Sequence, residues 1–134
     1  MMPYERFEAW KACHELALAV YRATRSFPRE ELYGLTSQAR RAAFSGPANI
    51  AEGSAKRGSA EFGRYLDITI GSLSELAYGL RLSRDLGLLS EDQWEEIDSV
   101  RDKASRLTWR LYERVRGSKR RTARARERDR LPTD

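Results

Sequence analysis

The sequence predicts an all-α protein, an antiparallel up-down-up-down four-helix bundle. Two observations support this prediction. Apolar residues recur at three- and four-residue spacing in four separate segments. The connections between these segments are short, as in bundles whose consecutive helices lie antiparallel. At 134 residues the chain has the size of one domain, which we place at residues 1–116, followed by a tail at 117–134.

The first helix is predicted at about residues 5–26. Pro28 disfavours helical geometry at Phe27 and so ends the helix. One apolar stripe is predicted to face the core, and its members are Phe7, Trp10, Ala17, Tyr21 and Thr24.

The second helix is predicted at about residues 35–55, with a heptad seam of small residues that lets a neighbouring backbone approach closely. Pro47 removes one helical hydrogen bond, so we expect a kink near residues 43–47. The alternative is a break there, with Ser45 capping a second piece. The seam consists of Leu35, Ala39, Ala42, Gly46, Asn49 and Gly53.

The third helix is predicted at about residues 59–86, with Ser59 as its N-cap and Gly87 as its left-handed C-terminal cap. It carries the clearest heptad of the chain, and that heptad consists of Phe62, Leu66, Thr69, Leu73, Leu76, Leu80 and Ser83.

The fourth helix is predicted at about residues 91–116, opened by a capping box between Ser90 and Gln93. The periodicity is lost after Arg116, so residues 117–134 are predicted to be disordered. The stripe of the fourth helix consists of Trp94, Ile97, Val100, Ala104, Leu107, Leu111 and Val115.

The charge of the chain is concentrated in the tail. The net charge is +5, and residues 117–134 contribute seven basic and three acidic residues, which leaves 18 basic and 17 acidic residues in 1–116. A basic tail on a nearly balanced domain favours an electrostatic partner such as RNA.

The chain also resembles one protein family. The similarity covers about residues 4–114 and is carried by WKACHELALAVYRAT, by FPREELYGLTSQARRAAFSGPANIAEGSAKRG and by EFGRYLDITIGSLSELAYGLRLSRDLG. These segments look like the four-helix bundle proteins encoded by intervening sequences in bacterial large-subunit ribosomal RNA genes. The accessory variability protein of diversity-generating retroelements is a relative of that family.

This resemblance implies a left-handed bundle that assembles into a ring, typically a homopentamer. It also implies a non-enzymatic role close to RNA or nucleoprotein. The retroelement relatives have strongly basic bodies, and the balanced charge of residues 1–116 departs from that pattern.

A structural polar network is predicted on the second helix, and its members are Arg41, Asn49 and Glu52. Arg40 and Arg41 are neighbours and therefore point about 100° apart on a helix. One interpretation has Arg41 reaching inward to Glu52 or Asn49. The other has both arginines contacting phosphates, and for Arg40 we leave the two equally open.

Besides Arg40, the residues predicted to bind nucleic acid fall into two groups. Lys56, Arg57 and Arg64 surround the turn between the second and third helices, where a solvated helix end is the simpler interpretation. The tail lacks aromatic residues, so base stacking there is not expected. Tails of this composition can also be merely solubilising. The tail candidates are Lys119, Arg120, Arg121, Arg124 and Arg126.

No pattern in the sequence predicts an enzyme, a cofactor or a metal. Cys13 and His14 are adjacent, so they diverge on a helix and do not form a catalytic pair, and they are the only Cys and His of the chain. A single cysteine fits a reducing cytoplasm, and no apolar run is long enough to span a membrane.

The number of large aromatic residues predicts contacts outside the four-helix core, and hence a homo-oligomer. The alternative to RNA binding is a scaffold ring that docks a partner protein without touching nucleic acid. The aromatic residues in question are Trp10, Trp94, Trp109, Tyr65, Tyr78 and Tyr112.

Overall fold

The structure is a computed structural model that describes residues 1–132, without the side chains of residues 118–122. All regular elements of the described residues are helical, which confirms the all-α prediction. They are the short 3₁₀ helices η1 (Pro3–Arg6) and η2 (Arg29–Glu31) and the α-helices α1 (Glu8–Thr24), α2 (Leu35–Ser54), α3 (Ser59–Asp85) and α4 (Glu91–Arg130).

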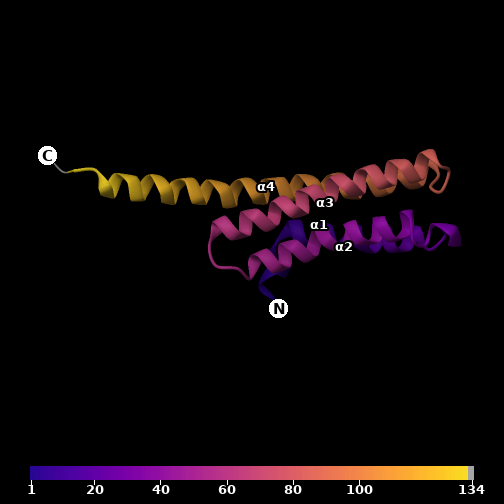
Figure 1. Ribbon diagram of the computed structural model, residues 1–134, viewed down its shortest axis with the longest axis horizontal. Helices are drawn as coiled ribbons and strands as arrows, with labels where there is room; N and C mark the ends of the chain where they lie inside the picture. Colours follow the sequence, from indigo (N-terminus) through magenta and orange to yellow (C-terminus); the bar gives the residue numbers. More distant parts are fainter. Residues whose placement is uncertain (133–134) are drawn as a thin grey trace.

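The four α-helices pack as a bundle. Helix α2 lies between α1 and α3 in the packing, α3 lies between α2 and α4, and α4 returns to contact α1. Figure 1 shows the bundle as two helical pairs, with α1 beside α2 and α3 beside α4. Helices that follow one another in the chain are therefore neighbours in space, as the short connections predict.

Helix α3 buries its heptad as predicted. Phe62, the first member of the heptad, is half-buried and packs against the core. The other members are buried, and they are Leu66, Thr69, Leu73, Leu76, Leu80 and Ser83.

The stripe predicted for α1 is fully buried only at Thr24, while Phe7, Trp10 and Ala17 are half-buried and pack against the core. Tyr21 is 43% exposed. The reason is that α1 carries two apolar stripes, and the one with smaller side chains fits against the small-residue seam of α2. The buried residues of α1 are Ala9, Ala12, Cys13, Leu16, Val20 and Thr24.

Helix α2 continues through Pro47 from Leu35 to Ser54, so the alternative of a break at Ser45 is wrong. The predicted kink stays a prediction. The seam brings α2 close to α3, because a Cβ added at Gly53 would lie 2.6 Å from Tyr65 Cβ. The fully buried seam residues are Ala39, Ala42, Gly46 and Gly53.

The caps match the sequence in two places and differ in a third. Gly87 has a φ of 77° just after α3, the left-handed conformation predicted for its C-terminal cap. Gln93 donates its backbone N–H to Ser90 Oγ at 3.1 Å, and Ser90 N–H donates to Gln93 Oε1 at 2.9 Å, which confirms the capping box. At α3, however, Gly58 is the N-cap and Ser59 is the first helical residue. Gly58 has a φ of 89°, a conformation that favours glycine over other residues.

Helix α4 differs most from expectation. It spans 40 residues and ends at Arg130, whereas the sequence predicted an end at Arg116 and a disordered tail. Ala and Arg are strong helix formers, and the next Pro is Pro132, so local propensity favours continuing the helix. Figure 1 shows α4 projecting well beyond the other helices, and we call residues 117–130 the overhang.

Candidate nucleic-acid interface

Arg40 is engaged in packing between helices. Its Nε donates to Thr24 Oγ1 at 2.9 Å, and its guanidinium lies 4.9 Å from the centre of the Tyr21 ring. Thr24 in turn donates to the carbonyl of Val20 at 2.8 Å. Arg40 therefore ties α2 to the last turn of α1, and of its two interpretations the structural one matches these contacts.

Arg41 points to α3. Its Nη2 donates to Gln38 Oε1 at 2.8 Å and lies 3.7 Å from Glu75 Oε1. The pairing of Arg41 with Glu52 or Asn49 was therefore a wrong prediction. Both side chains of the Arg41–Glu75 pair are more than half exposed, so the pair adds little to stability.

Asn49 and Glu52 have other partners, which sequence reasoning missed. Asn49 Nδ2 donates to the Ser45 carbonyl at 2.8 Å and to Ser45 Oγ at 3.0 Å, and Ser45 Oγ lies 2.8 Å from Ser72 Oγ on α3. Glu52 accepts a hydrogen bond from the Tyr65 hydroxyl at 3.3 Å. The four-residue spacing of Ser45 and Asn49 was the available signal.

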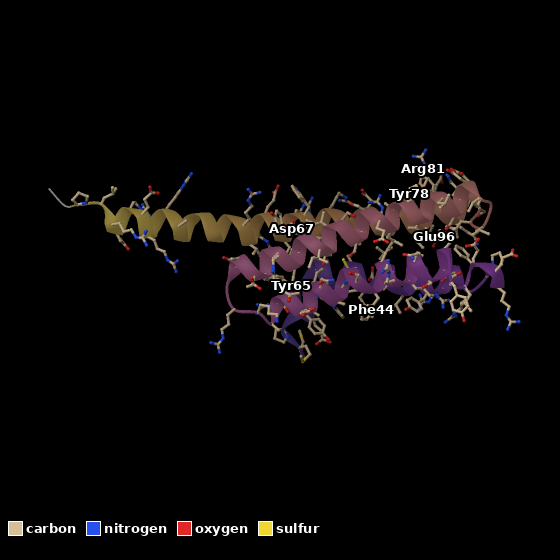
Figure 2. The ribbon with its side chains drawn as sticks, in the orientation of Figure 1. Phe44, Tyr65, Asp67, Tyr78, Arg81 and Glu96 are labelled. Carbon is tan, nitrogen blue, oxygen red and sulfur yellow. The ribbon has the colours of Figure 1, made fainter. Side chains whose placement is uncertain are left out.

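Two cations of the turn between α2 and α3 gather around one aromatic ring. Lys56 Nζ lies 5.7 Å and the Arg64 guanidinium 5.9 Å from the centre of the Tyr65 ring, which is labelled in Figure 2. Arg64 Nη2 is also 3.3 Å from Glu61 Oε2. Arg57 is exposed in the same turn. The cations at this end of the bundle are thus accessible, and of the three only Arg64 has an acidic partner among the described residues.

The overhang carries the densest cationic charge of the described residues. Arg124 and Arg126 are exposed there, and so are Arg128 and Arg130, which the predicted site did not include. The predicted residues whose side chains lie outside the described part of the structure are Lys119, Arg120 and Arg121.

An open pocket of about 500 Å³ lies between α3 and α4 where the overhang begins; we call it the α3–α4 pocket. Its polar and aromatic lining comes from α3 and from α4, and Trp109 stacks on its Tyr112 with ring centres 5.5 Å apart. Sequence reasoning missed this pocket, although Trp109, Tyr112 and Arg116 recur at three- and four-residue spacing. The polar and aromatic lining residues are Ser59, Arg64, Asp67, Tyr112 and Arg116.

A second surface, which we call the α1–α2 groove, is apolar. It holds about 610 Å³ and collects the aromatic stripe of α1 that the core leaves out. Phe44 is 65% exposed there, and His14 stacks on Trp10 with ring centres 5.0 Å apart. The groove is lined by Tyr4, Trp10, His14, Ala17, Leu18, Tyr21, Phe44, Pro47, Ala48 and Ala51.

Cys13 is a core residue. Its side chain is fully buried, its Sγ lies 3.6 Å from Thr108 Oγ1, and burial raises the pKa of the thiol to about 11. The thiol is therefore protonated at neutral pH and is a poor nucleophile. Within the part of the chain that the structure describes, no three His, Cys, Asp or Glu side chains are grouped as metal ligands. No helix in that part is long and apolar enough to cross a membrane.

Comparison with known proteins decides the family. The family model described as 23S rRNA-intervening sequence protein matches residues 5–110. The chain belongs to this family.

A solved structure supports the fold of this family member. The crystal structure of a protein of unknown function from the S23 ribosomal protein family of Bacteroides thetaiotaomicron is similar, with a TM-score of 0.70 at 20% identity. The similarity covers 78% of this chain and 97% of the other. At this identity the likeness concerns the fold alone. No curated protein matches the chain.

Proposed function

We propose that this family member is a non-enzymatic, cytoplasmic, oligomeric bundle that binds RNA electrostatically and with weak sequence specificity. The observation that carries the proposal is the overhang. It is a helix that leaves the bundle and presents arginines without aromatic residues among them. The description of the family, which refers to intervening sequences of 23S rRNA, adds support.

The geometry of the overhang suits a backbone contact. Arg124 and Arg128 are four residues apart and share one side of the helix, while Arg126 and Arg130 share the nearly opposite side. A helix with cations on two sides can contact two phosphate strands or two turns of one folded RNA. Such contacts release counterions and carry no sequence information.

We further propose that the bundle has the antiparallel, left-handed form and assembles head to tail into a ring of five, as the family resemblance implies. The α1–α2 groove supports assembly, because its lining is mainly apolar and Phe44 is exposed in it, and exposed apolar surface of this kind is common at protein–protein contacts. The proposed occupant of the groove is the α3 surface of a second copy, where Ile68 is 46% and Tyr78 is 66% exposed. Figure 2 shows Phe44 and Tyr78 on opposite sides of the molecule, as a head-to-tail contact needs.

RNA binding is tested by fluorescence anisotropy with a structured RNA across a salt series. The test variant replaces Arg124, Arg126, Arg128 and Arg130 with Gln. The control variant replaces four exposed arginines at the far end of the bundle with Gln, and these are Arg22, Arg25, Arg29 and Arg81.

We expect the overhang variant to bind more weakly and with a shallower salt dependence, by about 0.7 to 0.9 in the log–log slope for each lost phosphate contact. The control variant should bind like the wild type. Equal losses in both variants would contradict a site on the overhang.

Assembly is measured on the same protein by light scattering, where Phe44→Glu should yield smaller particles. A monodisperse wild-type monomer would contradict the ring. A ring that binds no RNA would favour the alternative function, a scaffold that docks a partner protein.

A further inference from the structure

The α3–α4 pocket lies where the overhang leaves the bundle, and its chemistry differs from that of the overhang. Its volume of about 500 Å³ falls within the usual range for small-molecule sites. Arginines, an aromatic ring and one carboxylate face it from two helices. We propose that this pocket binds one unpaired nucleotide of RNA whose base carries an exocyclic amino group. The inference rests on the RNA binding proposed above.

The aromatic wall supplies a stacking surface. Tyr112 is half-buried and lines the pocket, and the Trp109 ring is stacked on it at an angle of 29°. Trp109 is itself 50% exposed. A ring held by packing on one side and open on the other is the arrangement on which unpaired bases stack. The aromatic residues that the tail lacks are thus present one to two helical turns before it.

The two arginines of the pocket can bind phosphates. Arg116 is exposed at the end of the bundle part of α4, just before the overhang, and Arg64 lines the pocket from the opposite helix, α3. The contact between Arg64 and Glu61 is a surface pair at 3.3 Å, with side chains 68% and 48% exposed. Such a pair is weak enough for a phosphate to replace it.

The carboxylate of Asp67 indicates that the ligand of the pocket includes a base and is not a phosphate alone. Asp67 lines the same pocket, and Figure 2 places it on α3 beside α4. A carboxylate repels phosphate, but it accepts hydrogen bonds from amino groups such as N4 of cytosine. Uracil presents a carbonyl oxygen at the corresponding position and so is disfavoured by an acceptor. The pocket should therefore discriminate cytidine from uridine.

The test compares the affinity of the full chain for short oligocytidine and oligouridine of equal length at pH 7.5. Both oligomers have the same phosphate charge, so the electrostatic contribution of the overhang is the same for both, and the change in their affinity ratio in the Asp67 variant isolates the pocket. Asp67→Asn removes the acceptor-only group. Asp102→Asn makes the same charge change at an exposed site outside the pocket and serves as the control.

We expect the wild type to bind oligocytidine about tenfold more tightly than oligouridine. Asp67→Asn should reduce that ratio several-fold, while Asp102→Asn should leave it unchanged. Tyr112→Leu should weaken binding of both oligomers by about fivefold or more, since it removes a stacking surface. Circular dichroism then verifies that each variant keeps the helical content of the wild type.

Failure of this inference is distinguishable from failure of the proposed function. Salt-dependent binding of both oligomers with equal affinity would overturn the pocket and leave RNA binding by the overhang intact. An unchanged ratio in Asp67→Asn would overturn the role of the carboxylate and with it the proposed base preference. No binding of any RNA would overturn both proposals.

Discussion

The two parts of α4, one inside the bundle and one in the overhang, show that burial and local propensity can each maintain a helix. Residues 91–116 pack Ile97, Ala104 and Leu111 into the core. The overhang, at 117–130, has no apolar stripe, and its helix rests on the propensity of its Arg, Lys, Glu and Ala residues. Substitutions of buried residues therefore test residues 91–116, and substitutions of charged residues test the overhang. Mutations should separate the two with large effects in the bundle and small ones in the overhang.

The largest difference is expected for a pair of leucines. Leu73 on α3 is 1% exposed, whereas Leu131 directly after the overhang is 63% exposed. Leu73→Ala leaves a cavity and should lower the free energy of unfolding by about 2–5 kcal/mol. Leu131→Ala should change it by no more than about 0.5 kcal/mol. Urea denaturation of both variants at one protein concentration measures the difference, and similar losses would contradict the division between bundle and overhang.

A pair of glycines tests the close contact of α2 and α3. A Cβ at Gly53 would lie 2.6 Å from Tyr65 Cβ, while a Cβ at Gly71 would meet nothing within 4 Å. Gly53→Ala should cost about 1–3 kcal/mol, because neither backbone can yield without separating the helices. Gly71→Ala should stabilise by up to about 1 kcal/mol, since alanine is the better helix former. Thermal unfolding monitored by circular dichroism gives the sign of the stability change in both variants. A stabilising Gly53→Ala would refute the close approach of α2 and α3.

The smallest stability effect is expected when the chain ends at Arg116. This truncation removes helical residues but no buried side chain of the described structure, so the stability of the bundle should change by less than about 0.5 kcal/mol. The ellipticity at 222 nm per molecule should fall in proportion to the helix removed. A truncation that lowers the unfolding midpoint strongly would show that the overhang contacts the bundle or a second copy.

The accuracy of the sequence predictions follows the distribution of apolar residues. The heptad of α3 was predicted correctly because large aliphatic residues lie on one side of that helix, with only Ile68 and Tyr78 exposed among its larger apolar residues. Helix α1 has apolar residues on two sides, and the stripe of Trp10 and Tyr21 was as periodic as the buried one. Periodicity identifies an apolar face, but it does not determine which partner covers that face.

The candidate site was only partly predictable for a related reason. Charge alone identified the basic residues of the turn between α2 and α3 and those of the overhang up to Arg126, but not Arg128 and Arg130. Asp67 and Tyr112 are 45 positions apart in the sequence, and each by itself resembles an ordinary surface residue. Their meeting at one pocket depends on the packing of α3 against α4.

The sequence by itself determined the helical class, the order of the four helices, the capping box of α4 and the family, because these depend on spacing, composition and local hydrogen bonds. Only the tertiary structure decided which stripe of α1 enters the core, which partners Arg40 and Arg41 take, and which residues line the α3–α4 pocket. Those choices depend on the distances between helices, which the small residues of α2 set through close packing.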